Sequence, residues 1–208
     1  MASVIPYYTS PGNHERDHAG TGTFQLGDDS GGECGVPFNY RFIQKGGDAT
    51  SKPPPSYSTD LVPPFYSDNI GPIHVIFGST EHDYHVGSEQ HAFIQRDLVG
   101  VNRAVTPFVV FTGHRPMYSS VTCGEHAPPP WVVQPNSSYN WQMGVALEPL
   151  FEEHSVDLAL WGHVHNYERT CPMLNQTCLG GDGVKGKGKG VGGTVHVTAG
   201  TAGYECYF

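Results

Sequence analysis

The chain has 208 residues, of which 38% are hydrophobic and only 15% charged, with 27 glycines, 17 prolines and a formal net charge of −9. This composition is typical of a loop-rich globular protein, and the length suits one domain with a sizeable core. The acidic balance argues against a nucleic-acid partner, and no apolar run reaches the roughly 18 residues of a membrane-spanning helix.

Turn-forming residues dominate the first 60 positions, which predict surface loops with little regular structure. After them, hydrophobic patterns of strands and helices alternate along the chain. Strands are expected at 71–80, 106–114, 156–163 and 194–200, helices at 87–101 and about 141–154, and a glycine- and lysine-rich loop at 180–193. This alternation indicates parallel strand pairing and an α/β layered fold.

The five cysteines are scattered and form no CxxC pair, which argues against a zinc ribbon. Cys171 and Cys178 enclose a short loop and are candidates for a local disulfide. Asn136 and Asn175 begin N-glycosylation acceptor sequences, NSS and NQT. Both features favour an oxidising, secretory compartment, although the start of the chain lacks the basic and apolar regions of a signal peptide.

Histidines follow two of the predicted strands directly. His114 comes after FVVFTG, and His163 and His165 come after LALWG. The carboxyl ends of parallel strands share one edge of a sheet, and ligand sites gather there. We therefore expect these three histidines to lie at the same edge.

The stretch PGNHERD carries further side chains that bind metals. Asn13 has a neutral oxygen, His14 an imidazole and Glu15 a carboxylate. Imidazoles together with oxygen ligands suit zinc, iron or manganese. His163 and His165 are two positions apart, about 6–7 Å in an extended turn, which is wide for one ion. The pattern predicts a dinuclear centre, in which two ions lie about 3.5–4 Å apart and each takes one histidine.

Three blocks, GNHE at 12–15, GHRPMY at 113–118 and GHVHNYER at 162–169, resemble in order and spacing the last three metal-binding blocks of the purple acid phosphatases. These enzymes are calcineurin-like metallophosphoesterases, and the plant-type high-molecular-weight branch is the most similar. The resemblance implies a layered metallophosphoesterase sandwich, with mixed β-sheets flanked by helices. It covers nearly the whole chain, so residues 1–208 are expected to form a single catalytic domain.

The resemblance also implies a role for each matching residue. Asn13, His114 and His163 would bind a divalent ion, either zinc, manganese or iron. His165 would bind a ferric ion, Fe³⁺, and His14 would hydrogen-bond to the substrate phosphate and help the leaving group depart. The implied reaction is hydrolysis of phosphate monoesters in acid, with a metal-bound hydroxide as the nucleophile. The expected partner is a small phosphate ester, and a homodimer is common in the family.

The sequence also departs from the family pattern. Two earlier blocks, DxG and GDxxY, should precede GNHE and supply two aspartates and a tyrosinate, but the 12 residues before Asn13 contain neither. We therefore expect a catalytic domain that is incomplete at its N-terminus. Two alternatives stay open: a catalytically inactive glycoprotein that keeps the scaffold for binding, and a phosphodiesterase or nucleotide pyrophosphatase. In each case the expected location is secreted or vacuolar.

Overall fold

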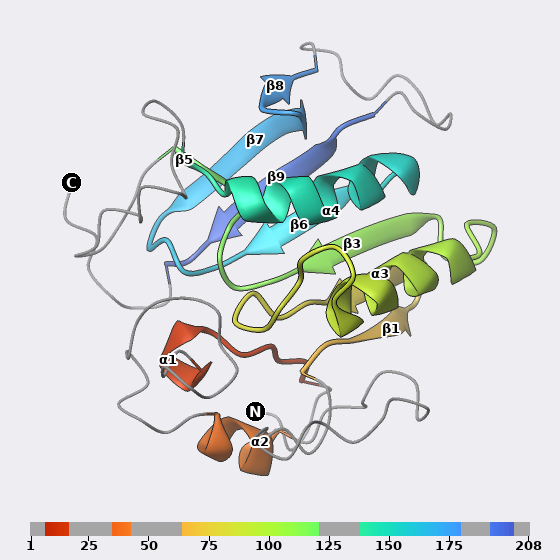
Figure 1. Cartoon of the computed structure of the whole chain (residues 1–208). Coiled ribbons are helices and arrows are strands. Elements are labelled where there is room, and N and C mark those ends of the chain that lie inside the picture. The colour runs from red at the N-terminus through yellow and green to blue at the C-terminus, as the bar shows by residue number, and fades with distance from the viewer. Residues whose placement is uncertain (1–6, 17–34, 43–63, 121–137, 180–191, 202–208) are drawn as a thin grey trace.

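The computed structural model describes residues 7–16, 35–42, 64–120, 138–179 and 192–201. Its centre is a seven-stranded mixed sheet in the order β1-β2-β3-β6-β9-β7-β8 (Figure 1). The strands of this sheet are β1 Tyr66–Ile70, β2 Ile73–Phe77, β3 Phe108–Thr112, β6 Leu158–Trp161, β7 Tyr167–Leu174, β8 Thr177–Cys178 and β9 Thr194–Ala199. A separate short pair joins β4 Tyr118–Ser119 to β5 Ser138–Tyr139.

The four strands expected from the sequence form the parallel centre of the sheet. β2 pairs with β3, β3 with β6 and β6 with β9, all in parallel. The prediction missed β1, β7 and β8, which pair antiparallel and make the sheet mixed. β1 is polar and partly exposed, and β7 carries a register shift between Arg169 and Pro172, so neither shows a clean alternating pattern.

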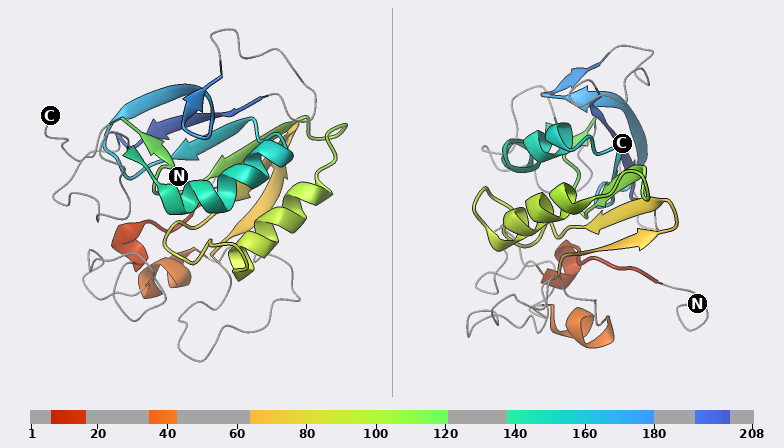
Figure 2. Two further views of the ribbon diagram at one scale, coloured as in Figure 1. Left: turned by 45° about the horizontal axis from the view of Figure 1, so that its top comes forward. Right: turned by 90° about the vertical axis from the view of Figure 1, so that its right-hand side faces the viewer.

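Two long helices lie on the same face of the sheet, as the two views of Figure 2 show. They are α3 Glu89–Gly100 and α4 Trp141–Glu153, close to the predicted bounds. Each begins at a side-chain cap: Ser88 accepts from His91 N, and Asn140 accepts from Met143 N. No helix among the described residues is long and apolar enough to cross a membrane.

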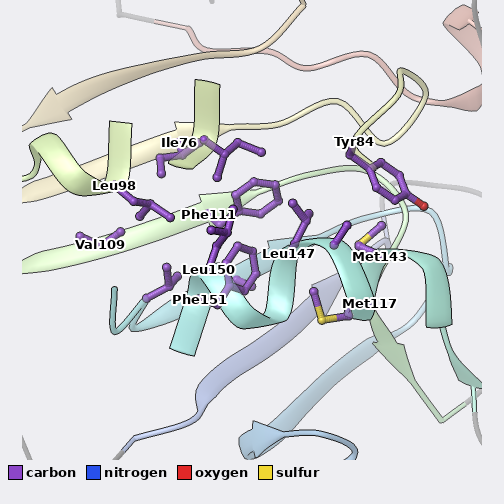
Figure 3. Close-up of a cluster of buried hydrophobic side chains, with 14 of the residues drawn as sticks. Ile76, Tyr84, Leu98, Val109, Phe111, Met117, Met143, Leu147, Leu150 and Phe151 are labelled. Carbon is purple, nitrogen blue, oxygen red and sulfur yellow. The ribbon is translucent and has the colours of Figure 1, made fainter. Parts of the chain in front are cut away.

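The core lies between these helices and the sheet (Figure 3). Phe111 of β3 is 1% exposed, and its ring centroid lies 5.0 Å from that of Phe151 and 5.5 Å from that of Trp161. Burial of each large apolar side chain contributes about 1.5–3 kcal/mol. This packing fixes β3 and β6 against one helical layer. The residues that directly follow these two strands are therefore held in place as well.

The first 60 residues were expected to hold little regular structure. The described part contains two short helices there, α1 Asn13–Arg16 and α2 Val36–Arg41. Most of the remaining positions in this region lie outside the described residues, as does most of the glycine- and lysine-rich loop at 180–193.

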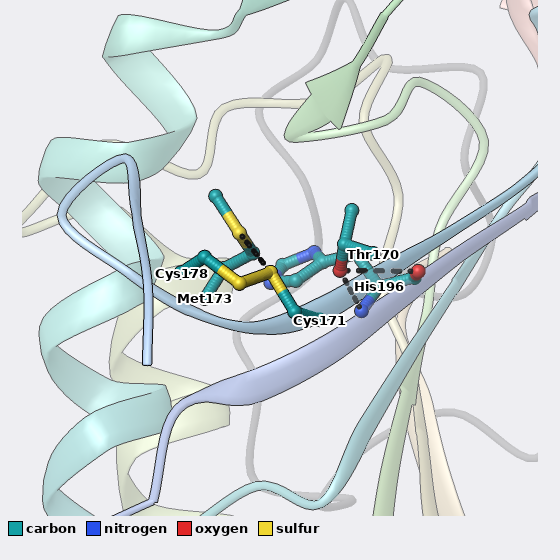
Figure 4. Close-up of a disulfide and its surroundings, with 5 residues drawn as sticks. All are labelled: Thr170, Cys171, Met173, Cys178 and His196. Carbon is teal, nitrogen blue, oxygen red and sulfur yellow. Dashed lines mark hydrogen bonds between the residues drawn. A yellow bond between two sulfur atoms is a disulfide. The ribbon is translucent and has the colours of Figure 1, made fainter. Parts of the chain in front are cut away.

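A disulfide joins Cys171 of β7 to Cys178 of β8, with the two sulfurs 2.05 Å apart (Figure 4). The predicted local pairing of these cysteines is therefore present in the structure. Beside it, His196 of β9 is 2% exposed and pairs with Thr170, whose hydroxyl accepts from His196 N at 2.9 Å. His196 Nδ1 accepts from Trp161 Nε1 at 3.1 Å.

Acid is expected to destabilise the fold through His196. Burial lowers the pKa of His196 to about 3, whereas an unfolded histidine titrates near 6.5. Between these pH values the unfolded chain takes up a proton that the folded chain does not. The contribution of neutral His196 is therefore complete above about pH 6.5 and is lost as the pH falls towards 3. By pH 4.5 the loss is about 2–3 kcal/mol.

Urea unfolding at pH 7 and pH 4.5 measures this loss. The matched variant is His196→Asn, which keeps an acceptor for Trp161 Nε1 but has no titrating ring. We expect the free energy of unfolding to fall by about 2–3 kcal/mol less in the variant than in the unmodified chain. The same fall in both proteins would show that another group carries the pH dependence.

Candidate metal centre

The segment that leads to Asn13 is anchored along the sheet edge. The ring of Tyr8 stacks on Phe77, with centroids 5.2 Å apart. Thr9 N donates to Tyr66 Oη at 3.1 Å, and Tyr66 Oη donates back to Thr9 O at 2.9 Å. Burial raises the pKa of Tyr66 to about 12, so this hydroxyl keeps its proton. These contacts bring α1 to the side of the sheet towards which β3 and β6 point (Figure 1).

A tight turn then presents Asn13. Gly12 N donates to Glu15 Oε2 at 2.9 Å, and Glu15 N donates to Gly12 O at 3.1 Å, which closes the turn. A Cβ atom on Gly12 would lie 2.9 Å from both Cε1 and Nδ1 of His114. Glycine is therefore needed at this position for the close approach of the turn to the histidine. Asn13 itself is 4% exposed.

The ends of β3 and β6 hold the other two side chains. Gly113 N donates to Leu160 O at 3.0 Å, and Gly162 N donates to His114 O at 2.9 Å, so the two strand ends stay paired. His163 then takes a left-handed conformation with φ of 64°. A non-glycine residue in this region is unusual and costs conformational energy, which packing must offset.

Three donor atoms from three separate segments meet at this edge. Asn13 Oδ1 lies 2.6 Å from His114 Nε2 and 3.1 Å from His163 Nδ1, and the two ring nitrogens are 3.1 Å apart. Asn13 is separated in sequence from His114 by 101 positions and from His163 by 150. We call these three atoms the donor triangle.

The dimensions of the donor triangle suit a metal ion. Ligands about 2.1 Å from one ion in tetrahedral or octahedral geometry lie about 3.0–3.4 Å from one another. The observed separations of 2.6–3.1 Å are close to that range. No three His, Cys, Asp or Glu side chains group in a metal-binding arrangement within the described ranges, since the third donor here is an amide. Asn13, His114 and His163 fit a divalent ion that accepts nitrogen and oxygen ligands.

The electrostatics of the site favour a neutral His114. Its burial lowers the pKa of His114 well below the usual range, and positive charge on His163, Arg115, His14 and His165 lowers it further. A neutral imidazole has a lone pair available for a metal. His165 and His14 therefore lie close enough to influence His114 electrostatically, although neither supplies an atom of the donor triangle.

Comparison with known proteins identifies the family of the chain. The family model of the calcineurin-like phosphoesterases matches residues 1–167. The chain belongs to this family. Its phosphoesterase fold, a mixed sheet flanked by helices, confirms the fold class expected from the sequence.

Similar proteins support the resemblance to purple acid phosphatases. Over 99% of its length the chain is 38% identical to probable inactive purple acid phosphatase 9 of Arabidopsis thaliana, and it covers 30% of that protein. Over 98% of its length it is 34% identical to a nucleotide pyrophosphatase/phosphodiesterase of Hordeum vulgare, of which it covers 50%. The structure of a purple acid phosphatase from yellow lupin seeds aligns with this chain at a TM-score of 0.76 and 35% identity. The alignment covers 100% of this chain and 33% of the lupin chain. The chain thus spans between 30% and 50% of the length of these relatives.

Sequence reasoning missed one buried pair beside the donor triangle. Glu81 is 0% exposed, and its Oε1 accepts from Arg115 Nε at 2.8 Å. Burial raises the pKa of Glu81, while the Arg115 guanidinium opposes that rise. A sequence signal was available, because Glu81 follows β2 and so lies at the same sheet edge as His114.

The two predicted glycosylation sites differ in what the structure describes. Asn175 is exposed at the turn between β7 and β8, with φ of 46°. Asn136 lies outside the described residues.

Proposed function

We propose that residues 1–208 belong to a catalytic domain that hydrolyses phosphate monoesters with the help of bound metal. The observation that carries this proposal is the donor triangle of Asn13, His114 and His163 at the carboxyl ends of β3 and β6. Its donor types suit zinc, manganese or ferrous iron. The family model and the purple acid phosphatase relatives support phosphate esters as the substrate class.

In this proposal each residue of the site has a defined task. Asn13, His114 and His163 hold the divalent ion, and His165, two positions beyond His163, would face a second, ferric ion. Bound ions would supply the Lewis acidity that activates water and neutralises charge on the phosphoryl oxygens. Desolvation holds the pKa of His114 well below its usual range, which favours the neutral imidazole that a metal ligand needs.

His14 has a different position from the ligands. It is exposed, next in sequence to buried Asn13, and its charge acts on His114. A side chain at the open side of the site suits contact with an incoming substrate. We assign His14 a hydrogen bond to the phosphate and proton donation to the leaving oxygen.

A second candidate function is supported by the names of the relatives. The Arabidopsis protein is named as probably inactive, and the barley protein is named for nucleotide pyrophosphatase and phosphodiesterase activity. A binding protein with this fold and no metal would keep the side chains at the sheet edge but would hydrolyse no ester. A phosphodiesterase would keep the metal but accept a substrate with two ester bonds.

Zinc content and hydrolysis together test the proposal. Elemental analysis of the zinc-equilibrated chain at neutral pH is expected to give at least one ion per chain. Release of nitrophenol from 4-nitrophenyl phosphate should exceed release from bis(4-nitrophenyl) phosphate and should stop when a chelator removes the metal. Metal without turnover of either ester would favour the inactive binding protein, and faster diester cleavage would favour the phosphodiesterase. A chain that takes up no metal would exclude the proposed chemistry for these residues.

The site of action is also a proposal. The Cys171–Cys178 disulfide and the exposed acceptor Asn175 suit a secreted or vacuolar glycoprotein. If so, expression through a eukaryotic secretory pathway should give a product whose mass falls on treatment with an N-glycosidase, and Asn175→Gln should reduce that fall.

A further inference from the structure

Arg115 follows the candidate ligand His114 and is held in place from two sides. Its Nε donates to Glu81 Oε1 at 2.8 Å, and that carboxylate is fully buried. Its backbone N donates to Thr80 Oγ1 at 3.0 Å, and Thr80 Oγ1 donates in turn to Glu81 Oε1 at 3.0 Å. Both the main chain and the guanidinium of Arg115 are thus fixed relative to the end of β2.

The rest of the guanidinium is available to a ligand. The Arg115 side chain is 20% exposed, whereas its partner Glu81 is 0% exposed, so the exposed part lies away from that contact. Across the described ranges, the two Nη atoms of Arg115 have no hydrogen-bond acceptor. A guanidinium held through Nε still presents N–H donors from both Nη atoms, and their planar arrangement suits phosphate oxygens. Arg115 directly follows His114 at the end of β3, so its anchored main chain adjoins the donor triangle.

Two other arginines of the described part, Arg103 and Arg96, are less suited to this role. Arg103 is engaged by Pro107 O at 2.9 Å and by Asp157 Oδ2 at 2.7 Å. Arg96 lies exposed on α3. The donor triangle consists of one amide oxygen and two imidazole nitrogens, and the chain as a whole carries a net charge of −9. An anionic substrate therefore benefits from a fixed positive side chain next to His114.

We propose that Arg115 is a phosphate-binding residue of the candidate metal centre and that Glu81 is the residue that positions it. This inference rests on the proposed function, because the phosphate is the reacting group of the substrate. It also narrows the substrate class. A terminal phosphate has three non-bridging oxygens, enough to face both a metal ion and Arg115, whereas a diester has two. Terminal phosphates are thus the preferred ligands.

The test compares variants that leave no buried carboxylate without a partner. Arg115→Gln alone would leave the buried carboxylate of Glu81 without its cationic partner, which could prevent folding. Glu81→Gln and the double variant Glu81→Gln/Arg115→Gln avoid this problem and differ from each other only at Arg115. Arg115→Lys keeps the charge but loses the planar donors. Arg96→Gln is the matched control, because it removes the same charge from an exposed position of α3.

Isothermal titration measures zinc affinity first and then the affinity of the zinc-loaded chain for inorganic phosphate. We expect the double variant to bind phosphate about 10- to 100-fold more weakly than Glu81→Gln, the range for a lost hydrogen bond to a charged group. Glu81→Gln itself should bind phosphate about 5-fold more weakly than the unmodified chain. Zinc affinity should differ by no more than about 3-fold among all these proteins. An unchanged zinc affinity beside weaker phosphate binding would show that Arg115 contacts phosphate rather than supporting the loop around His114. Arg115→Lys should fall between these values, and Arg96→Gln should match the unmodified chain.

Two results would overturn the inference. Equal phosphate affinity in Glu81→Gln and the double variant would show that Arg115 does not contact phosphate. A parallel loss of zinc and phosphate would show that the pair only supports the loop around His114. If the unmodified chain takes up no zinc, the proposed function fails at that step. The phosphate titration without zinc then decides the inference: weaker binding without Arg115 supports it, and equal binding excludes it.

Discussion

Replacement of His163 by alanine is expected to lower the zinc affinity of the chain by about 100-fold or more. His163 Nδ1 lies 3.1 Å from both Asn13 Oδ1 and His114 Nε2, so its loss removes one corner of the donor triangle. Loss of a residue that only supports a ligand costs about 10- to 100-fold, and loss of the ligand itself should cost at least as much. Competition titration against a zinc-binding dye measures the dissociation constants of both proteins.

His85→Ala is the matched control for this experiment. The His85 side chain is 46% exposed and bonds to Asp83 rather than to the donor triangle. Its zinc affinity should equal that of the unmodified chain. If both alanine variants bound zinc alike, the donor triangle would not be the metal site.

Gly200→Ala is expected to destabilise the chain by about 3 kcal/mol and to weaken zinc binding as well. A Cβ atom at position 200 would lie only 2.0 Å from Val164 O and 2.7 Å from Val164 C, both of them backbone atoms. Gly200 N also donates to Asn166 O at 3.0 Å. The loop from His163 to Asn166 must therefore move to make room, and the Nδ1 atom of His163 moves with it.

Urea unfolding and zinc titration of the same samples test both parts of this expectation. The control is Gly100→Ala at the end of α3, where nothing lies within 4 Å of the added Cβ. Alanine there should be neutral or stabilise the helix by up to about 1 kcal/mol. If Gly200→Ala left the free energy of unfolding unchanged, the end of β9 and the loop from His163 to Asn166 would move apart at little cost.

The centre of the fold could be predicted because its signals are local and strong. β2, β3, β6 and β9 are short apolar runs bounded by turn formers, and α3 and α4 carry helical stripes. The antiparallel strands could not be predicted in this way. β1 reads YSDNI, and its strand character comes from pairing with β2 across the turn at Gly71, whose φ is 59°. β7 contains Pro172 and charged residues, which a strand at that place tolerates because β9 supplies the pairing.

Some residues of the candidate site could be predicted from the sequence, and others could not. His114 and His163 follow predicted strands, and the rule that ligands gather at strand ends predicts their meeting, whereas the role of Asn13 was implied only by the family resemblance. The Glu81–Arg115 pair depends instead on burial. A lone glutamate in GSTEHD reads as a surface residue, and only the packed structure shows that its carboxylate is 0% exposed. The left-handed conformation of His163 is likewise not revealed by spacing alone.

The wide sequence separation within the donor triangle makes metal availability a thermodynamic variable of folding. Because its members are 101 and 150 positions apart, the unfolded chain has no preformed site, and an ion that binds the triangle binds the native state alone. By mass action, free metal at 100 times its dissociation constant would raise the unfolding free energy by about 2.7 kcal/mol. Scarcity of metal in the compartment would then reduce the amount of folded protein, and thus its abundance, before any effect on turnover.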